Sequence, residues 1–216
     1  MAKLISVNVG VPREIFWKNR VVTTSIFKEP VAGRVTVRKH NLAGDQQADL
    51  SVHGGPDKAV YVYPSEHYEF WRNELPGVDL PWGMFGENLT IEGLMEDEVN
   101  IGDRFHIGSS VLAVTQPRMP CFKLAAKFGR DDIIKRFLDS GRSGFYLAVI
   151  EEGEGGAGDA IERIHRDEND ITIAATVNAY VNGADDQDWL ARASRHESLP
   201  EGWRKHFRKR LKEAVI

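Results

Sequence analysis

The 216-residue sequence contains a single cysteine, Cys121. One cysteine excludes an internal disulfide, and it also excludes the four-cysteine sets that hold iron–sulfur clusters and many structural zinc ions. No run approaches the roughly 20 consecutive apolar residues that a membrane-spanning helix requires. The sequence also lacks a glycine-rich dinucleotide fingerprint and a flavin motif. The chain must therefore fold around its hydrophobic core, and it carries no motif for a nicotinamide or flavin of its own.

Composition limits the class of protein further. The first five residues lack the apolar core of a signal peptide, so we expect a cytoplasmic protein without a membrane anchor. A formal net charge of -4 argues against general affinity for nucleic acid, and we expect no specific nucleic-acid partner. With 42% hydrophobic and 28% charged residues, the chain can bury one domain, or one domain with a small appendage.

Most of the chain has the pattern of β-strands. Runs of β-branched residues bounded by glycine and proline predict strands over 3–9, 21–27 and 34–37, which we interpret as a β-meander. Later strands are predicted over 59–63, 104–107, 111–115, 145–150 and 160–164. The segment 86–91 is predicted to lead into a further strand. The glycine-rich segment 153–158 is interpreted as a flexible turn without function. The predicted fold is mostly β with α, with a β domain over 1–166.

Helical signals fall in two parts of the chain. A helix opening at 64–66 places Tyr68, Trp71 and Leu75 on one face, which is typical of core residues, and a second runs from Asp131–Asp132 to Gly141. From Asp170 onward the pattern is wholly helical and predicts a three-helix module over 167–216. Its three helices are expected to begin at Asp170, Asp185 and Pro200. The last is rich in Lys and Arg, which we interpret as a solvated face; a phosphate-bearing partner or a reductase is the alternative.

Cys121 lies in the segment 116–124, QPRMPCFKL, directly after a predicted strand. Pro120 suits a first helical position and Gly129 a C-terminal cap, so Cys121 is expected in the first helical turn. The helix dipole, together with Arg118 and Lys123, would lower the thiol pKa below its usual value of about 8.5. Such a thiolate would act as a nucleophile, a persulfide carrier or a soft metal ligand. The alternative is a small buried hydrophobic residue.

Three polar loops are expected to meet at one rim of the β domain: the long loop through His53, the turn Gly86–Asn88, and the end of the strand before Cys121. Together they would combine the cysteine sulfur, which is a soft ligand, with the side chains of His53 and Lys58 and the backbone amides of Gly54 and Gly55. Each signal has a structural alternative, since a lone histidine or a glycine turn is common in ordinary folds. From the residues alone, the prediction is an anion-binding cleft beside a reactive sulfur.

Four ordered motifs carry a family resemblance. They are GDQQADLSVHGGPDKAVY at 44–61, GMFGENLT at 83–90, IGD at 101–103 and QPRMPCFKL at 116–124. In this order and spacing the chain resembles the MOSC family, named for the C-terminal domain of molybdenum cofactor sulfurases, and within it the stand-alone bacterial YiiM type. The resemblance covers nearly the whole chain. It implies a MOSC-type β-barrel domain followed by a three-helix extension.

The resemblance also implies a cofactor and its ligands. The family binds the molybdenum cofactor (molybdopterin), a pterin dithiolene with a phosphate tail. Cys121 matches the cysteine that ligates molybdenum, or that carries persulfide in the sulfurase branch, and Asn88 matches a cofactor-contacting asparagine. Gly86 stands where the mitochondrial branch has an arginine, so phosphate binding is expected to use Lys58, Arg118 or Lys123 instead. The histidine–glycine–glycine loop, His53 to Gly55, is typical of the YiiM type.

These features imply a molybdenum-dependent reductase that converts small N-hydroxylated compounds, such as N-hydroxylated purine or pyrimidine bases, to amines. Cys121, His53 and Glu87 are the candidate catalytic residues, the last two as proton donors. Electrons would come from a separate flavoprotein or other reductase. The alternatives are a persulfide sulfur carrier for metallocofactor assembly and a non-catalytic anion- or cofactor-binding module. The sequence leaves open the exact substrate, the electron donor, and whether the protein forms a homodimer.

Overall fold

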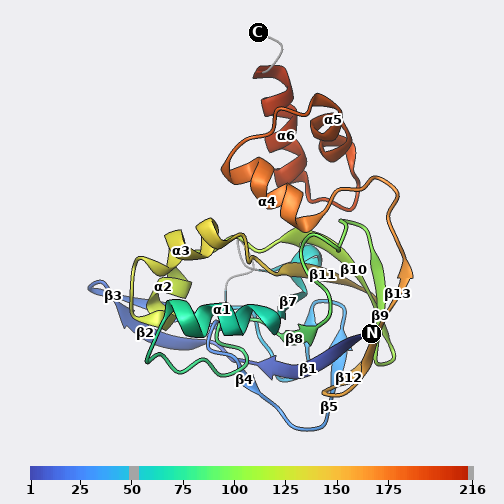
Figure 1. Cartoon of the computed structure of the whole chain (residues 1–216). Helices are drawn as coiled ribbons and strands as arrows, with labels where there is room; N and C mark the ends of the chain where they lie inside the picture. The colour runs from blue at the N-terminus through green and yellow to red at the C-terminus, as the bar shows by residue number, and fades with distance from the viewer. Residues whose placement is uncertain (49–53, 214–216) are drawn as a thin grey trace.

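The structure, a computed structural model, describes residues 1–48 and 54–213. Seven strands form a closed barrel in the order β13–β9–β10–β11–β7–β8–β1, and β1 pairs back with β13. They are β1 (Ala2–Val9), β7 (Val60–Pro64), β8 (Leu89–Glu92), β9 (Arg104–Ile107), β10 (Ser110–Pro117), β11 (Phe145–Glu151) and β13 (Ala160–His165). Strands β7 and β8 are parallel and the other neighbours are antiparallel. This closed barrel confirms the predicted mostly β fold (Figure 1).

The remaining strands correct two predictions. They are the hairpin of β2 (Arg13–Trp17) and β3 (Arg20–Thr24), β4 (Glu29–Pro30) beside β1, and a sheet of β12 (Gly153–Gly156), β5 (Arg34–Arg38) and β6 (Asn41–Leu42). The predicted N-terminal meander is wrong, because β1 pairs with β8 and β13 from far along the chain. The predicted flexible turn is largely strand β12. A Cβ on Gly153 would lie 2.6 Å from the backbone of Ser109, so glycine there serves close packing of main chains.

Three helices lie along one side of the barrel (Figure 1). They are α1 (Glu66–Glu74), α2 (Phe122–Phe128) and α3 (Ile133–Ser140), and a short 3-10 turn, η1 (Pro56–Lys58), precedes β7. Tyr68, Trp71 and Leu75 are at most 1% exposed, which confirms the predicted core stripe of α1. Trp71 and Tyr68 pack on Phe85 of the turn before β8, with ring centroids 5.4 and 5.3 Å apart. The aromatic cluster thus fixes α1 and this turn to each other.

The C-terminal helices form the predicted three-helix module: α4 (Ile173–Val181), α5 (Gln187–Arg195) and α6 (Glu201–Glu213). Two predicted caps shift, because Thr172 and Asp186, rather than Asp170 and Asp185, accept the capping hydrogen bonds. Backbone hydrogen bonds from Ile101 to Ile171 and from Ile173 to Val99 join the module to the barrel domain. Apolar residues of both parts belong to one core cluster.

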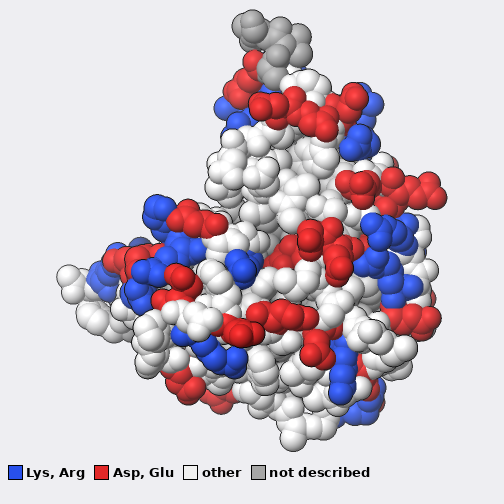
Figure 2. Space-filling model, in the orientation of Figure 1, with Lys and Arg blue, Asp and Glu red and all other residues white. Residues whose placement is uncertain are grey.

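The surface carries both charge signs. On the face in Figure 2, Lys and Arg alternate with Asp and Glu over the barrel and the module. Within α6, Arg204 and Arg208 pair with Glu201, and Lys209 pairs with Glu213. Within residues 1–48 and 54–213, no helix is long and apolar enough to cross a membrane.

Candidate active site

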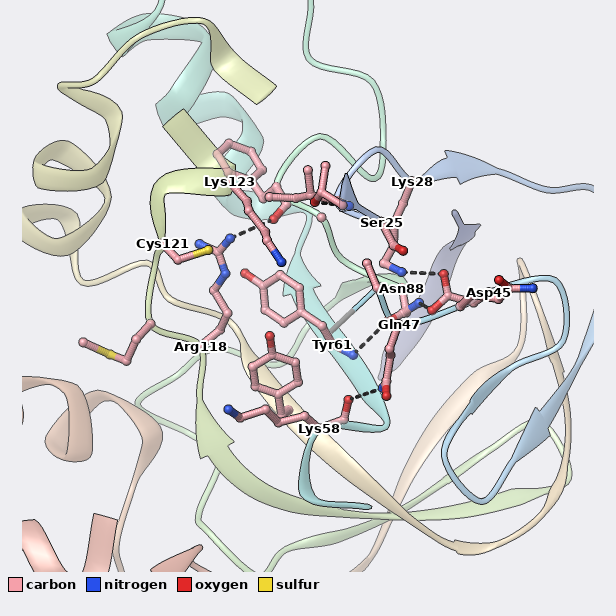
Figure 3. A pocket seen from close by; sticks show the side chains of 18 residues that line it. Ser25, Lys28, Asp45, Gln47, Lys58, Tyr61, Asn88, Arg118, Cys121 and Lys123 are labelled. Carbon is pink, nitrogen blue, oxygen red and sulfur yellow. Dashed lines mark hydrogen bonds and ion pairs between the residues drawn. The ribbon is translucent and has the colours of Figure 1, made fainter. Parts of the chain in front are cut away.

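A cavity of about 670 Å³, part of it open to solvent, lies where four segments meet. These segments are the chain after β3, the loop after β6, the turn before β8 and the connection from β10 to α2 (Figure 3). The predicted meeting of the cysteine segment, the Gly86 turn and the loop through His53 is observed for the described residues of that loop, which include Gln46, Gln47 and Lys58.

Cys121 stands on the cavity wall at the start of α2 (Figure 3). Its φ of -130° and ψ of 173° make it the extended N-cap residue, so the helix begins one residue later than predicted and Pro120 lies outside it. The C-terminal cap at Gly129, with φ 66°, is as predicted. The Cys121 side chain makes no capping hydrogen bond to α2. Cys121 therefore lines the cavity at the point where the helix begins.

Arg118 lines the cavity and is a buried cation, only 5% exposed. Nη2 donates to the carbonyl oxygen of Phe85 at 3.5 Å, whereas Nη1 is buried and has no hydrogen-bond partner within the described part of the chain. The guanidinium carbon lies 5.5 Å from the centroid of the Tyr61 ring. Because a buried charged donor without a partner is costly, this geometry favours an anionic ligand beside Nη1.

Two lysines add positive charge. Lys123, on the first turns of α2, is 9% exposed and lines the cavity, and Lys58 lines it from the end of η1 (Figure 3). Burial lowers the pKa of Lys58, while the nearby Asp57 and Cys121 oppose this effect. Burial raises the pKa of Tyr61 and of Tyr146, so both phenols stay neutral. The cavity thus combines cations with two neutral aromatic rings, whose centroids are 5.2 Å apart.

Asn88 lies in the cavity wall, and its side-chain amide forms hydrogen bonds within the protein. Its Oδ1 accepts a hydrogen bond from the backbone N–H of Tyr61 at 3.1 Å, and its Nδ2 donates to Asp45 Oδ2 at 2.9 Å. Asp45 in turn pairs with Lys28 from the chain after β3. The cofactor contact predicted for Asn88 is untested, whereas a role in holding the wall is evident from these bonds.

Other predicted site residues lie elsewhere. Glu87 is 0% exposed and does not line the cavity. Its carboxylate accepts hydrogen bonds from Tyr68 Oη, Thr90 Oγ1 and the backbone N–H groups of Gly83 and Phe85, so it stabilises the turn rather than facing a substrate. Gly54 and Gly55 line a neighbouring groove instead of this cavity. His53 lies outside the described residues.

Several lining residues escaped the sequence analysis: Ser25, Lys28, Asp45, Gln47, Tyr61 and Tyr146. Asp45, Gln47 and Tyr61 belong to the motif at 44–61, which was a usable signal. No sequence motif pointed to Lys28, because the β2–β3 hairpin brings it to the cavity only in the folded protein. Tyr146 lies in β11, where successive side chains point to opposite faces of the sheet, and only the closed barrel shows which face is turned to the cavity.

The fold and the cavity together define a closed β-barrel protein with a cavity that is lined by lysine and arginine side chains and by a cysteine. The chain belongs to the MOSC domain family, whose model matches residues 49–162, and a second model, the YiiM-like 3-alpha helix domain, matches residues 171–214. Both matches agree with the observed division into barrel and helices.

Individual relatives extend the match over most of the chain. YflK of Bacillus subtilis is 40% identical over 96% of this chain and 93% of its own, and YiiM of Escherichia coli is 34% identical over 87% and 84%. The crystal structure of YiiM from Geobacillus stearothermophilus matches with a TM-score of 0.81 at 36% identity, covering 98% of this chain and 100% of that one. A protein of Gibberella moniliformis named reductase is 37% identical over 67% of this chain, which corresponds to 26% of its own length.

Proposed function

We propose that this protein is a molybdenum-cofactor-dependent reductase that converts N-hydroxylated compounds, N-hydroxylated bases above all, to the corresponding amines. Membership of the MOSC family and the relative named reductase support an oxidoreductase of this type. The observation that carries the proposal is the shared cavity of Cys121 and Arg118, whose buried Nη1 lacks a partner among the described residues.

The chemistry of the cavity fits this cofactor. A terminal phosphate needs strong donors, and Arg118 Nη1 and Lys123 Nζ supply charge-assisted ones. The flat pterin suits the faces of Tyr61 and Tyr146. A thiolate such as that of Cys121 is a soft ligand suited to a metal already held by dithiolene sulfur. Bound there, the cofactor would supply a two-electron couple.

The chain itself must position the substrate and provide protons. Reduction of an N–OH group to an amine consumes two electrons and two protons and releases water. Lys58 replaces Glu87 as our candidate proton donor, because it lines the cavity beside Cys121 and burial lowers the pKa of its ammonium. Electrons would reach the site from a separate flavoprotein or other reductase, since the sequence has no flavin or nicotinamide motif.

The test is metal and pterin analysis of protein produced in a molybdenum-replete host, with turnover of an N-hydroxylated purine driven by a chemical reductant. Wild-type protein should carry molybdenum and release the amine, and Cys121→Ala should do neither. Phe16→Ala is a matched control, because Phe16 is a 73% exposed aromatic on β2. More than a few per cent of activity in Cys121→Ala with molybdenum still bound would show that Cys121 is not the ligand.

The same preparation separates the alternatives. A mass increase of about 32 Da on Cys121, in protein without metal, would indicate the persulfide carrier. Protein with neither metal nor added sulfur would indicate a non-catalytic anion-binding module.

A further inference from the structure

A groove between the barrel and the three-helix module adjoins the cofactor cavity. Its walls come from the loop around η1, the connection from β10 to α2, and residues of α4 and α6. Lys58, Met119, Cys121 and Tyr146 line both the cavity and the groove. A molecule in the groove would therefore meet the cavity at Cys121.

The far wall of the groove is aromatic and fixed in orientation. Trp203 of α6 donates a hydrogen bond from Nε1 to Oε1 of Gln116 at 2.9 Å, which ties the indole to the barrel. The ring of Tyr180, from α4, lies 5.0 Å from that of Trp203 with an interplanar angle of 56°. Tyr180 is 41% exposed. A held aromatic face offers stacking area at little further cost in side-chain entropy.

The rest of the groove is mostly uncharged. Pro117, Pro120 and Met119 line it, and among the described residues the lining groups that can carry charge near neutral pH are Asp57, Lys58 and Cys121. This lining does not suit a polyanion, which would need several cations. It suits a flat heterocycle with one polar end, because stacking on an aromatic side chain tolerates any base and contributes a large part of base binding.

We propose that this groove binds the substrate of the reductase, with the planar ring of an N-hydroxylated base against Trp203 and its N–OH group directed to the opening beside Cys121 and Lys58. The inference rests on the proposed function for the identity of the reacting group. It gives the three-helix module a task in the reaction, and it assigns Gly54 and Gly55 to the substrate side of the site rather than to the cofactor.

Equilibrium binding tests the groove without any turnover. Calorimetric titration with an unreactive base, adenine, should show binding that weakens about tenfold or more in Trp203→Leu and largely recovers in Trp203→Phe, which keeps an aromatic face. Phe16→Leu, at the exposed aromatic of β2, should bind like the wild type. If Trp203→Leu fails to fold, Tyr180→Leu replaces a half-exposed ring of the same wall and should also weaken binding. Unchanged affinity in the folded variants would overturn the proposal.

Kinetics then distinguish this inference from the proposed function. With loaded enzyme, the ratio of kcat/KM for an N-hydroxylated purine to that for N-hydroxyurea, which has no ring, should fall about tenfold in Trp203→Leu. If base binding depends on Trp203 but the protein has no reductase activity, the groove proposal stands and the proposed reductase function fails. Reductase activity with an unchanged ratio would retain the enzyme and reject the groove.

Discussion

Lys28 and Asp45 form a buried ion pair in the wall of the cavity beside Cys121, with Nζ 2.5 Å from Oδ1 and side chains 9% and 2% exposed. Asp45 also accepts hydrogen bonds from the backbone N–H of Gly10 and from Asn88 Nδ2. Burial lowers the pKa of Lys28, and the neighbouring carboxylate opposes this effect. The pair therefore joins the chain after β3 to the loop after β6 and, through Asn88, to the turn before β8, and so shapes the cavity.

We expect Asp45→Ala to lower the free energy of unfolding by about 3–5 kcal/mol, because it leaves the Lys28 ammonium buried without its carboxylate. Lys28→Met should cost less in the Asp45→Ala background than in the wild type, by at least about 1 kcal/mol. Urea denaturation of the two single variants and the double variant measures this coupling. Simple additivity of the two changes would contradict it.

Substitution of Cys121 should separate stability from activity. The residue is an extended N-cap without a capping hydrogen bond, and serine is a strongly preferred N-cap. We expect Cys121→Ser to be about 0.5–2 kcal/mol more stable than Cys121→Ala, while both lose reductase activity. Thermal denaturation and the purine assay, run on the same preparations, measure the two effects. Substantial activity in the serine variant would show that sulfur is not required.

Local signals predicted the elements better than their pairing. The strands predicted over 104–107 and 111–115 and the α1 stripe of Tyr68, Trp71 and Leu75 follow from residues close together in the chain, and both were found. The pairing of β1 with β13 joins opposite ends of the barrel domain, which no local pattern encodes. Strand β12 was missed because its glycines have the composition of a turn.

The same distinction holds for the site. Arg118, Cys121 and Lys123 lie within six residues of one another, and the structure places all three at the cavity. Lys28 reaches it only through tertiary folding. Glu87 was selected for its polar neighbourhood, but sequence cannot show that four donors within the fold already satisfy its carboxylate.

Lys127 of α2 should make stability rise with pH. Burial lowers its pKa from 10.5 to about 8, and its Nζ donates to the carbonyl oxygens of Ile26 and Gly83. Between about pH 8 and 10.5 the unfolded chain holds a proton at this residue that the folded chain has released, so the free energy of unfolding increases with pH. Below pH 8 both states are protonated and this contribution is constant.

We expect the stability difference between wild type and Lys127→Met to shift by roughly 1–2 kcal/mol in favour of the wild type from about pH 7.5 to 9.5. Urea denaturation across this range measures it. Lys135→Met, at an 81% exposed side chain on α3, is the control and should show no such shift. A constant difference for Lys127→Met would contradict the buried, titrating lysine.

Gly86→Ala should damage the cavity by two effects. Gly86 has φ 85°, which disfavours a side chain, and an added Cβ would lie 2.8 Å from Ile26 Cγ1 on the cavity wall. Gly77→Ala is a matched control, because Gly77 has φ 81° but no atom within 4 Å of such a Cβ. Each should lose about 1 kcal/mol or more from strain, and Gly86→Ala should lose more and bind less cofactor. Equal stability and cofactor content of the two variants would show that the Ile26 contact is unimportant.

The three-helix module should be inseparable from the barrel. Ile171 and Ile173 are 0% exposed, belong to the barrel's core cluster and carry backbone hydrogen bonds to Ile101 and Val99. Burial of each such side chain contributes about 1.5–3 kcal/mol, so a chain that ends at Arg166 should aggregate or melt at least about 10 °C lower.

Charge reversal on α6 provides the control for this truncation. Arg208 is unsuitable for such a control, because it donates to the carbonyl oxygen of Ser194 and pairs with Glu201. Lys205→Glu changes an exposed residue instead, and this variant should stay soluble with a melting temperature near that of the wild type. A soluble truncated chain that melts with the wild type would show that the module is an independent appendage, and the substrate groove at Trp203 would then lack the fixed wall on which it depends.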